Sequence, residues 1–298
     1  MGKYSLTPTD QTFPRACFLG LCTIDVIHSV ARLPSRNSKN VALRQQVFAG
    51  GPAANAAATF AHLGGHANLL TVIGRNPVAE LIRQDLNAIG VEIIDLEPTF
   101  TEPPSISSIL VTAKNGERVV VSANATRLPV PARMDTSILD GSSVLLVDGH
   151  FPKASQELAR HAKREGIPVV LDSGSWKTGM EDLLHFIDIA ICSQDFAPSA
   201  GRSEANLIDY MFRLGIEKVA FTAGKDPIRY YLAQGKGSIP VPKTKAVDTL
   251  GAGDVFHGAF CHRHISHPSD FIGNLKFAAA IATKSCQYFG TRAWMKDF

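Results

Sequence analysis

The stretch VDTLGAGDVF, Val247–Phe256, places Gly-Ala-Gly between two carboxylates. Glycine adopts backbone conformations closed to other residues and lets a ligand approach the main chain, so Gly251 and Gly253 predict a bend built for close contact. Apolar residues at helical spacing follow the bend, which predicts a helix with Asp254 in its first turn. Free N–H groups at a helix start bind anions, whereas an acidic residue there commonly caps the helix. The stretch therefore predicts either an anion site or a simple cap.

Outward from this stretch, short apolar runs alternate with amphipathic segments along most of the chain. The runs at 142–149, 167–174 and 188–193 are typical of strands buried on both faces, with helices between them. The first run, 16–30, is predicted as a buried strand that ends in a turn at Asp25. This alternation predicts one doubly wound α/β domain, whose mostly parallel sheet carries helices on both faces.

Two stretches depart from the alternation of strands and helices. Residues 39–49 and 105–124 alternate polar and apolar side chains, and the second contains KNGE, a hairpin signal. We expect a small β-sheet lid, with strands from about 28–48 and 105–124, standing off the main body. The domain is expected to span 16–298, behind a loose tail at 1–15.

The composition excludes several classes of partner. The 298 residues are 45% hydrophobic and 19% charged, and the net charge of +3 without a basic run argues against nucleic acid or a membrane surface. No apolar run is typical of a membrane helix or signal peptide. Five widely spaced cysteines favour reduced thiols in the cytoplasm.

Other catalytic chemistry finds little support in the sequence. Four histidines near 257–267 lack the spacing of a zinc motif, so they are predicted at surface or helix-end positions. The chain has no G-x-x-x-x-G-K-[ST] phosphate loop, and no G-x-G-x-x-G follows a strand.

Ligands of open parallel sheets bind at the carboxyl ends of the strands. Polar residues and glycines at predicted strand ends or helix starts are Asp25, Gly50, Gly51, Asp148, Asp172, Ser193, Thr222, Gly224 and Asp254. Among them, AGGPAANAA (49–57) and DTLGAGDVFHGAF (248–260) resemble the paired signatures of the ribokinase family, the PfkB-type carbohydrate kinases. The resemblance extends from Ala16 onward, and its motifs are most similar to those of ketohexokinases and sulfofructose kinases.

The resemblance implies a ribokinase-like fold and ATP-dependent phosphorylation of a sugar hydroxyl, with a ketose or related furanose favoured. By position, Asp254 matches the catalytic base, and the amides of Gly251, Ala252 and Gly253 match the anion hole. Phosphoryl transfer depends on positioning and electrostatics, so a carboxylate for the alcohol belongs beside backbone donors for the phosphate oxygens.

The sugar-binding residues are also implied by the resemblance. Asp25 matches a carboxylate that binds substrate hydroxyls, although a turn cap is the alternative. Close helix packing is the alternative for the turn and helix start around Gly50. The predicted set is Asp25, Asn37, Lys39, Gly50, Gly51, Asn55, Asn124 and His150, of which His150 replaces an expected arginine.

The resemblance also implies a set of nucleotide-binding residues. Its predicted residues are Ser193, Thr222, Gly224, Asp248, Thr249, Ala279, Ala282 and Gly290. Simple packing or a β-turn is the alternative for several of them. Ser193 and Phe196 replace an Asn and a Glu that organise Mg²⁺ through water, so Asp172 and Asp195 are candidates for that task. A requirement for a monovalent cation such as K⁺ stays open.

Two other functions remain open on the sequence. A nucleoside kinase would use the same base on a ribose hydroxyl, and a non-catalytic sugar or nucleotide sensor would keep the fold without turnover. We also expect a homodimer formed through the lid strands.

Overall fold

The computed structural model describes residues 13–114, 116–131, 133–197 and 203–297. The larger of its two sheets runs β13-β12-β11-β10-β9-β8-β1-β4-β5. The pairs from β11 to β5 are parallel, while β12 and β13 form an antiparallel edge. Its strands are β1 (Arg15–Leu19), β4 (His66–Thr71), β5 (Val91–Asp95), β8 (Val144–Val147), β9 (Val169–Ser173), β10 (Ile189–Ser193), β11 (Lys218–Ala223), β12 (Asp226–Leu232) and β13 (Gly235–Ile239).

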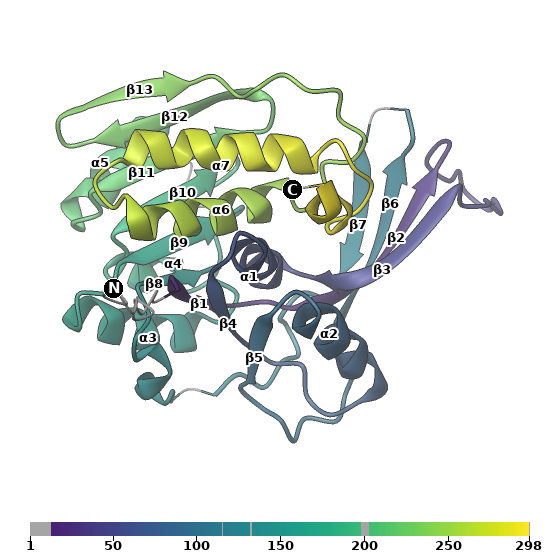
Figure 1. Cartoon of the computed structure of the whole chain (residues 1–298), viewed down its shortest axis with the longest axis horizontal. Coiled ribbons are helices and arrows are strands. Elements are labelled where there is room, and N and C mark those ends of the chain that lie inside the picture. The colour runs from purple at the N-terminus through teal and green to yellow at the C-terminus, as the bar shows by residue number, and fades with distance from the viewer. Residues whose placement is uncertain (1–12, 115, 132, 198–202, 298) are drawn as a thin grey trace, which may run out of the picture.

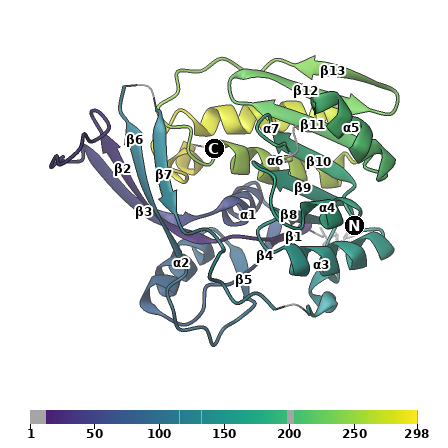
Figure 2. The same ribbon diagram turned by 180° about the vertical axis from the view of Figure 1, so that it is seen from behind.

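Helices cover both faces of this sheet (Figures 1 and 2). One hydrophobic core joins the sheet to α1, α2, α6 and α7, and a second core joins its other face to α3, α4 and α5. The doubly wound, mostly parallel fold is therefore confirmed. The helices are α1 (Pro52–His62), α2 (Pro77–Asn87), α3 (Pro152–Arg164), α4 (Met180–Leu184), α5 (Glu204–Arg213), α6 (Ala252–Ser266) and α7 (Phe271–Ser285), with short 3-10 turns η1 (Thr136–Leu139) and η2 (Ala293–Asp297).

The smaller sheet stands to one side of the main body, at the right in Figure 1. Its order is β3-β2-β6-β7. Its strands are β2 (Thr23–Val30), β3 (Arg44–Gly50), β6 (Ser105–Thr112) and β7 (Arg118–Ser122). This is the predicted lid, although it begins before residue 28. Position 115 of the hairpin between β6 and β7 lies outside the described residues.

The prediction of one strand ending in a turn at Asp25 was wrong. The chain leaves the main sheet at Gly20 and enters the lid at Thr23, so Asp25 lies inside a lid strand. Asp148 fixes this crossing, because its Oδ2 accepts a hydrogen bond from the Leu21 amide at 2.8 Å. A side chain on Gly20 would collide with the Asp148 carboxylate. A continuous apolar run hides such a change of sheet, since both strands are buried.

Helices α1 and α6 form the floor beneath the lid. Five of the six alanines of α1 are buried, and Gly258 of α6 packs so closely that a Cβ there would collide with the Ala56 carbonyl oxygen. Small residues allow this backbone approach. The close packing brings Asn55 on α1 within hydrogen-bond distance of Asp254 on α6.

Some predictions about the strands and the N-terminal tail differ from the structure. Strand β5 and the edge pair β12–β13 were not predicted. Most of the predicted tail, residues 1–12, lies outside the described residues, and Arg15 already belongs to β1. All five cysteines are free. Among the described residues, no helix is both long and apolar enough to cross a membrane.

Candidate active site

Asp254 lies in the first turn of α6, as predicted, and is partly buried. Its Oδ2 accepts a hydrogen bond from Asn55 Nδ2 at 2.8 Å. Burial raises the pKa of Asp254 from 3.8 to about 7, and the nearby Asp172 carboxylate adds to the increase, while the Asn55 hydrogen bond and His257 oppose it. A carboxylate whose pKa lies near neutrality is suited to general base catalysis.

Gly251 opens α6 in the left-handed conformation, with φ of 69°. The first amides of the helix follow this turn, and a helix start favours negative charge. The Ala252 amide donates to the Thr249 carbonyl at 3.3 Å, so that predicted anion-hole donor has a partner within the loop. No other atom lies within 4 Å of a Cβ built on Gly253, which leaves the helix start accessible on that side.

A cavity of about 170 Å³ lies between this helix start and the lid. Most of the predicted sugar-binding residues line it: Asp25, Gly51, Asn55, Asn124 and His150, together with Asp254 and Gly251. Lid residues Ser107, Ile109, Val120 and Ser122 complete the lid side. The lining therefore joins residues from both sheets and from α1 and α6.

Asp25 occupies the lid strand β2 and is buried. Burial raises the pKa of Asp25, whereas hydrogen bonds from Thr23 and Ser107 oppose the rise. Thr23 Oγ1 donates to Asp25 Oδ1 at 2.7 Å. Gly50 has no room for a side chain, because a Cβ there would collide with the Asp25 carboxylate. Gly50 therefore serves the site by admitting Asp25.

Two predicted lid residues are not among those lining the cavity. Asn37 and Lys39 lie in the exposed segment between β2 and β3, and Asn37 has φ of 56°. Asn124 also adopts a left-handed conformation, at φ 50°, where β7 has ended. His150 lines the cavity, and burial lowers its pKa, which favours the neutral imidazole.

The predicted nucleotide residues lie along one edge of the main sheet and the loops around it. Ser193 and Thr222 are register partners at the ends of β10 and β11, and Gly224 follows with φ of 59°. Asp248 is buried and ties two loops together, because it accepts hydrogen bonds from the amides of Leu250 (2.9 Å) and Gly290 (3.0 Å). It therefore shapes the loop before α6.

The two alanines predicted for the nucleotide side differ in exposure. Ala279 is 3% exposed and belongs to the hydrophobic core, which agrees with the packing alternative. Ala282 is only partly buried.

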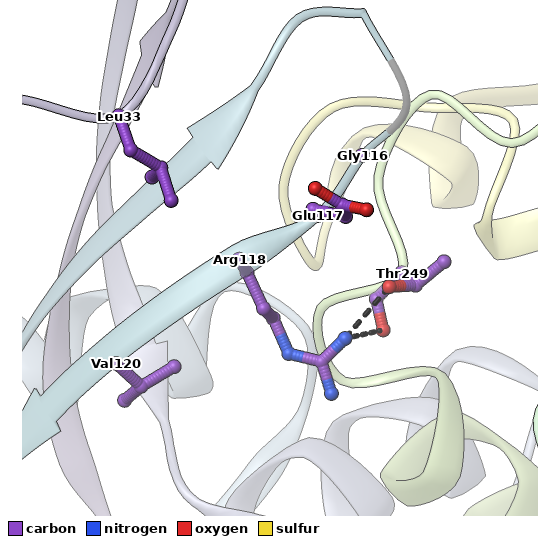
Figure 3. Close-up of a pocket in the computed structure, with 6 residues that line it drawn as sticks. All are labelled: Leu33, Gly116, Glu117, Arg118, Val120 and Thr249. Carbon is purple, nitrogen blue, oxygen red and sulfur yellow. Dashed lines mark hydrogen bonds between the residues drawn. The ribbon is translucent and has the colours of Figure 1, made fainter.

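The lid contacts the loop before α6 through Arg118. Its Nη1 lies 2.6 Å from Thr249 Oγ1 and 3.4 Å from the Thr249 carbonyl oxygen (Figure 3). These two residues and Leu33, Gly116, Glu117 and Val120 line a second, more open hollow of about 600 Å³. The hairpin of β6 and β7 is thus joined to the segment that carries the helix start.

His257 and Asp172 form a buried pair behind the site, which the sequence did not indicate. His257 Nδ1 lies 3.3 Å from Asp172 Oδ2 and 2.7 Å from the Gly253 carbonyl, and Nε2 lies 3.0 Å from the Ile191 carbonyl. Carbonyls only accept hydrogen bonds, so both ring nitrogens of His257 face acceptors. The pair occupies the Asp172 carboxylate that was a candidate for binding Mg²⁺ waters.

The prediction of surface or helix-end histidines was wrong for His257, which is 4% exposed. His264 does lie in the last turn of α6, but it is buried, at 3% exposed. His264 stacks on Phe260, with ring centroids 5.6 Å apart. Sequence spacing excluded a zinc motif but could not show which face of the helix is buried. Among the described residues there is no group of three or more candidate metal ligands.

Arg292 is the other functional candidate that the sequence analysis missed. Its buried guanidinium donates to Asn55 Oδ1 and to the Ala49 carbonyl, each at 2.8 Å. It follows Gly290 by two residues in FGTR, but nothing in that short stretch shows that the chain returns to α1.

Residues 14–297 match the model of the pfkB family of carbohydrate kinases. The chain belongs to this family. It is an ATP-dependent carbohydrate kinase with the ribokinase-like fold. Ribokinase of Bacillus subtilis is 25% identical over 285 residues, which cover 94% of this chain and 95% of the relative.

Two further pfkB relatives show the range of the comparison. An ATP-dependent ribose-1-phosphate kinase of Halopiger xanaduensis is 27% identical over 242 residues, covering 79% of this chain and 80% of the relative. The structure of Arabidopsis thaliana ribokinase complexed with ribose and ATP superposes with a TM-score of 0.74 at 22% identity, covering 96% of this chain and 98% of that chain.

Proposed function

We propose that this pfkB kinase transfers the γ-phosphate of ATP to a hydroxyl of a small neutral sugar, with a ketose or a related furanose such as ribose favoured. The observation that carries the proposal is the position of Asp254. It lines the small cavity and also occupies the first turn of α6, where a helix start favours negative charge. A base for the sugar and donors for the phosphate thus lie within one helical turn.

The chemistry follows from this geometry. The sugar hydroxyl would lie against Asp254, which accepts its proton as the oxygen attacks the γ-phosphorus. The amides at Gly251 and Gly253 are placed to stabilise charge on the transferred phosphoryl group. Asp25 accepts a hydrogen bond from a second hydroxyl and fixes the orientation of the ring. The lid strands exclude water and so suppress hydrolysis of ATP.

The charges of the cavity support a neutral substrate. Its described lining contains two carboxylates, Asp25 and Asp254, but neither lysine nor arginine. His150 is held neutral by burial, which lowers its pKa. A phosphate or sulfonate group would therefore meet negative charge without a compensating cation.

The size of the cavity supports a monosaccharide. At about 170 Å³, it is smaller than the roughly 300–1,000 Å³ of sites for drug-sized ligands. A nucleoside would need more room than the cavity offers.

Residues near the helix start support ATP and Mg²⁺ as co-substrates. The space beside Gly253 is open, and Ser193, Thr222 and Gly224 lie at neighbouring strand ends. Asp195 is exposed beside Ser193, whose Oγ accepts from the Asp195 amide at 3.3 Å. The oxygen atoms of these two side chains could accept hydrogen bonds from the waters of a Mg²⁺ ion that is bound to the nucleotide phosphates. The ion would neutralise phosphate charge.

The outer face of the lid supports a homodimer. Register places Val47, Val119 and Val121 on the face opposite the cavity, where they are 43%, 44% and 68% exposed. A row of exposed valines on a two-sided sheet favours burial against a second copy.

The five free cysteines, four of them buried, support a reducing compartment such as the cytoplasm.

The first experiment measures ADP release from ATP and Mg²⁺ with free pentoses and hexoses, ketoses, sugar phosphates, sulfosugars and nucleosides. We expect turnover with a neutral sugar and little with the anionic sugars or nucleosides. Asp254→Asn is the control, and its kcat should fall about 10²–10⁴-fold while ATP binding is retained. Parallel assays with and without K⁺ test the monovalent cation.

Each contrary result overturns part of the proposal. Preference for a sugar phosphate or sulfosugar contradicts the argument from charge, and preference for a nucleoside contradicts the argument from size. Undiminished turnover by Asp254→Asn removes the assigned base. Binding of ATP and sugar without turnover favours the sensor.

A further inference from the structure

Arg292 is a buried cation that does not line the cavity itself but contacts Asn55, which does. Its side chain lies between the C-terminal turn, α1 and α2, and the residue is 8% exposed. Its guanidinium has three partners from distant parts of the chain: Asn55 Oδ1 and the Ala49 carbonyl, both at 2.8 Å, and Asp85 Oδ2, which lies 3.4 Å from Nε. Nη1 also lies 3.5 Å from the carbonyl of the neighbouring Thr291. A buried charge is costly unless it is paired, so three partners indicate a fixed arrangement.

The contact with Asn55 determines which way its amide points. An amide side chain has an accepting oxygen at one end and a donating NH₂ at the other, and guanidinium only donates. Arg292 therefore requires the Asn55 oxygen, and the NH₂ must face the other way. On that side it meets Asp254 Oδ2 at 2.8 Å.

Asp85 of α2 completes the arrangement. Its Oδ2 accepts a hydrogen bond from the Ala49 amide at 3.0 Å, while Arg292 donates to the Ala49 carbonyl. Both backbone groups of Ala49 are thus held, directly before the Gly50–Gly51 turn that borders the cavity. The buried Arg292–Asp85 ion pair therefore fixes both the backbone that precedes the Gly50–Gly51 turn and the Asn55 side-chain amide beside Asp254.

We propose that Arg292, backed by Asp85, is a positioning residue for phosphoryl transfer: it holds the Asn55 amide so that its NH₂ donates to Asp254. This inference rests on the proposed function, in which Asp254 is the general base. Arg292 contacts Asp254 only through Asn55, although its charge also acts on the carboxylate at a distance.

The arrangement has a consequence for the ionisation of Asp254. A donor stabilises the carboxylate relative to the carboxylic acid, so loss of an oriented NH₂ should raise the pKa of Asp254. The other titratable groups that face Asp254 are Asp172 from β9, His257 from α6 and Asp25 from β2. They remain in every variant below, so a change in the pH profile reports on the Asn55 contact and the Arg292 charge.

The test compares the full-length enzyme with Arg292→Met across pH. We expect kcat/KM for the sugar to fall about 10- to 100-fold, as for loss of a hydrogen bond to a charged group. The acid limb of the profile should move to higher pH, and KM for ATP should change little.

Arg83→Met is the matched control. Arg83 also pairs with a buried carboxylate, Asp95, at 2.9 Å, but it lies away from the cavity lining. This variant should lose stability and keep the wild-type profile. If Arg292→Met leaves Asp85 unpaired and folds poorly, Asp85→Asn/Arg292→Met removes both charges and is judged by the same criteria.

A double-mutant cycle with Asn55→Ala separates positioning from general destabilisation. If Arg292 acts through Asn55, adding Arg292→Met to Asn55→Ala should lower kcat/KM by less than threefold. Losses that multiply, or an unmoved acid limb in Arg292→Met, would overturn the inference. Failure of the proposed function is recognised separately, because the wild type would then turn over no sugar or Asp254→Asn would keep full activity.

Discussion

The floor and the lid of this kinase enclose the same cavity but are built in opposite ways. In the floor, α1 and α6 touch through backbone and small side chains, with no space for a methyl group between Gly258 and Ala56. In the lid, strands carry apolar residues on both faces, so Val120 lines the cavity while Val121 is 68% exposed. The floor therefore has no room for a larger side chain at this contact, whereas the exposed face of the lid can change side chains without disturbing the core.

The largest expected effect on stability is that of Gly258→Ala, a substitution in the floor. The added methyl must displace the Ala56 carbonyl, a backbone atom, so we expect the free energy of unfolding to fall by about 1–3 kcal/mol. Gly253→Ala is the matched substitution in the same helix, where a Cβ meets nothing within 4 Å. It should keep or raise stability by up to about 1 kcal/mol and yet lower kcat, because its methyl borders the phosphate path. Denaturant unfolding and steady-state kinetics of both variants check this prediction. A loss of stability in Gly253→Ala, together with unchanged stability in Gly258→Ala, would contradict it.

The second test sharpens the comparison through pH. Asp254 has a pKa of about 7 in the folded protein against 3.8 ordinarily. Below pH 7 the base is protonated, so kcat/KM should fall about tenfold per pH unit and level off above it. The pKa of the lid carboxylate Asp25 is also raised. In the proposed mechanism Asp25 binds sugar without accepting its proton, so Asp25→Asn should raise KM and keep the acid limb.

The same shift predicts how stability changes with pH. A raised pKa means that the folded state holds a proton which the unfolded state releases, so stability contributed by protonated Asp254 is lost as pH rises from about 4 to 7. Asp254→Asn should lack this contribution and be relatively more stable at pH 8. Thermal unfolding across pH checks the sign, and a wild type that gains on the variant as pH rises would contradict it.

The smallest expected effect lies on the outer face of the lid. Val121→Ser should change the free energy of unfolding by less than about 0.5 kcal/mol, because the side chain is already exposed. If the lid forms the dimer interface, the variant should shift the dimer toward monomer in sedimentation experiments. Val41→Ser is the control, since Val41 is 84% exposed on the segment between β2 and β3. Equal behaviour of both variants and the wild type would place the interface elsewhere.

Much of the fold was predictable because its signals are local. Continuous apolar runs predicted the parallel strands except β5, and alternation predicted the lid strands β3, β6 and β7. The crossing at Gly20 and the edge pair β12–β13 were missed. In both places the local pattern fits more than one sheet, and only pairing with distant strands decides between them.

The site features likewise separate into those encoded locally and those that depend on tertiary contacts. The sequence by itself determined the family, the carboxylate and the glycines of VDTLGAGDVF, and the GGPAANAA turn, because their chemistry and spacing lie within single segments. Only the tertiary structure decided that Asp25 belongs to the lid, that Asp172 faces His257, and that Arg292 orients Asn55 across 237 positions of the chain. Such contacts depend on which buried faces meet, and no local period encodes the partner of a buried charge.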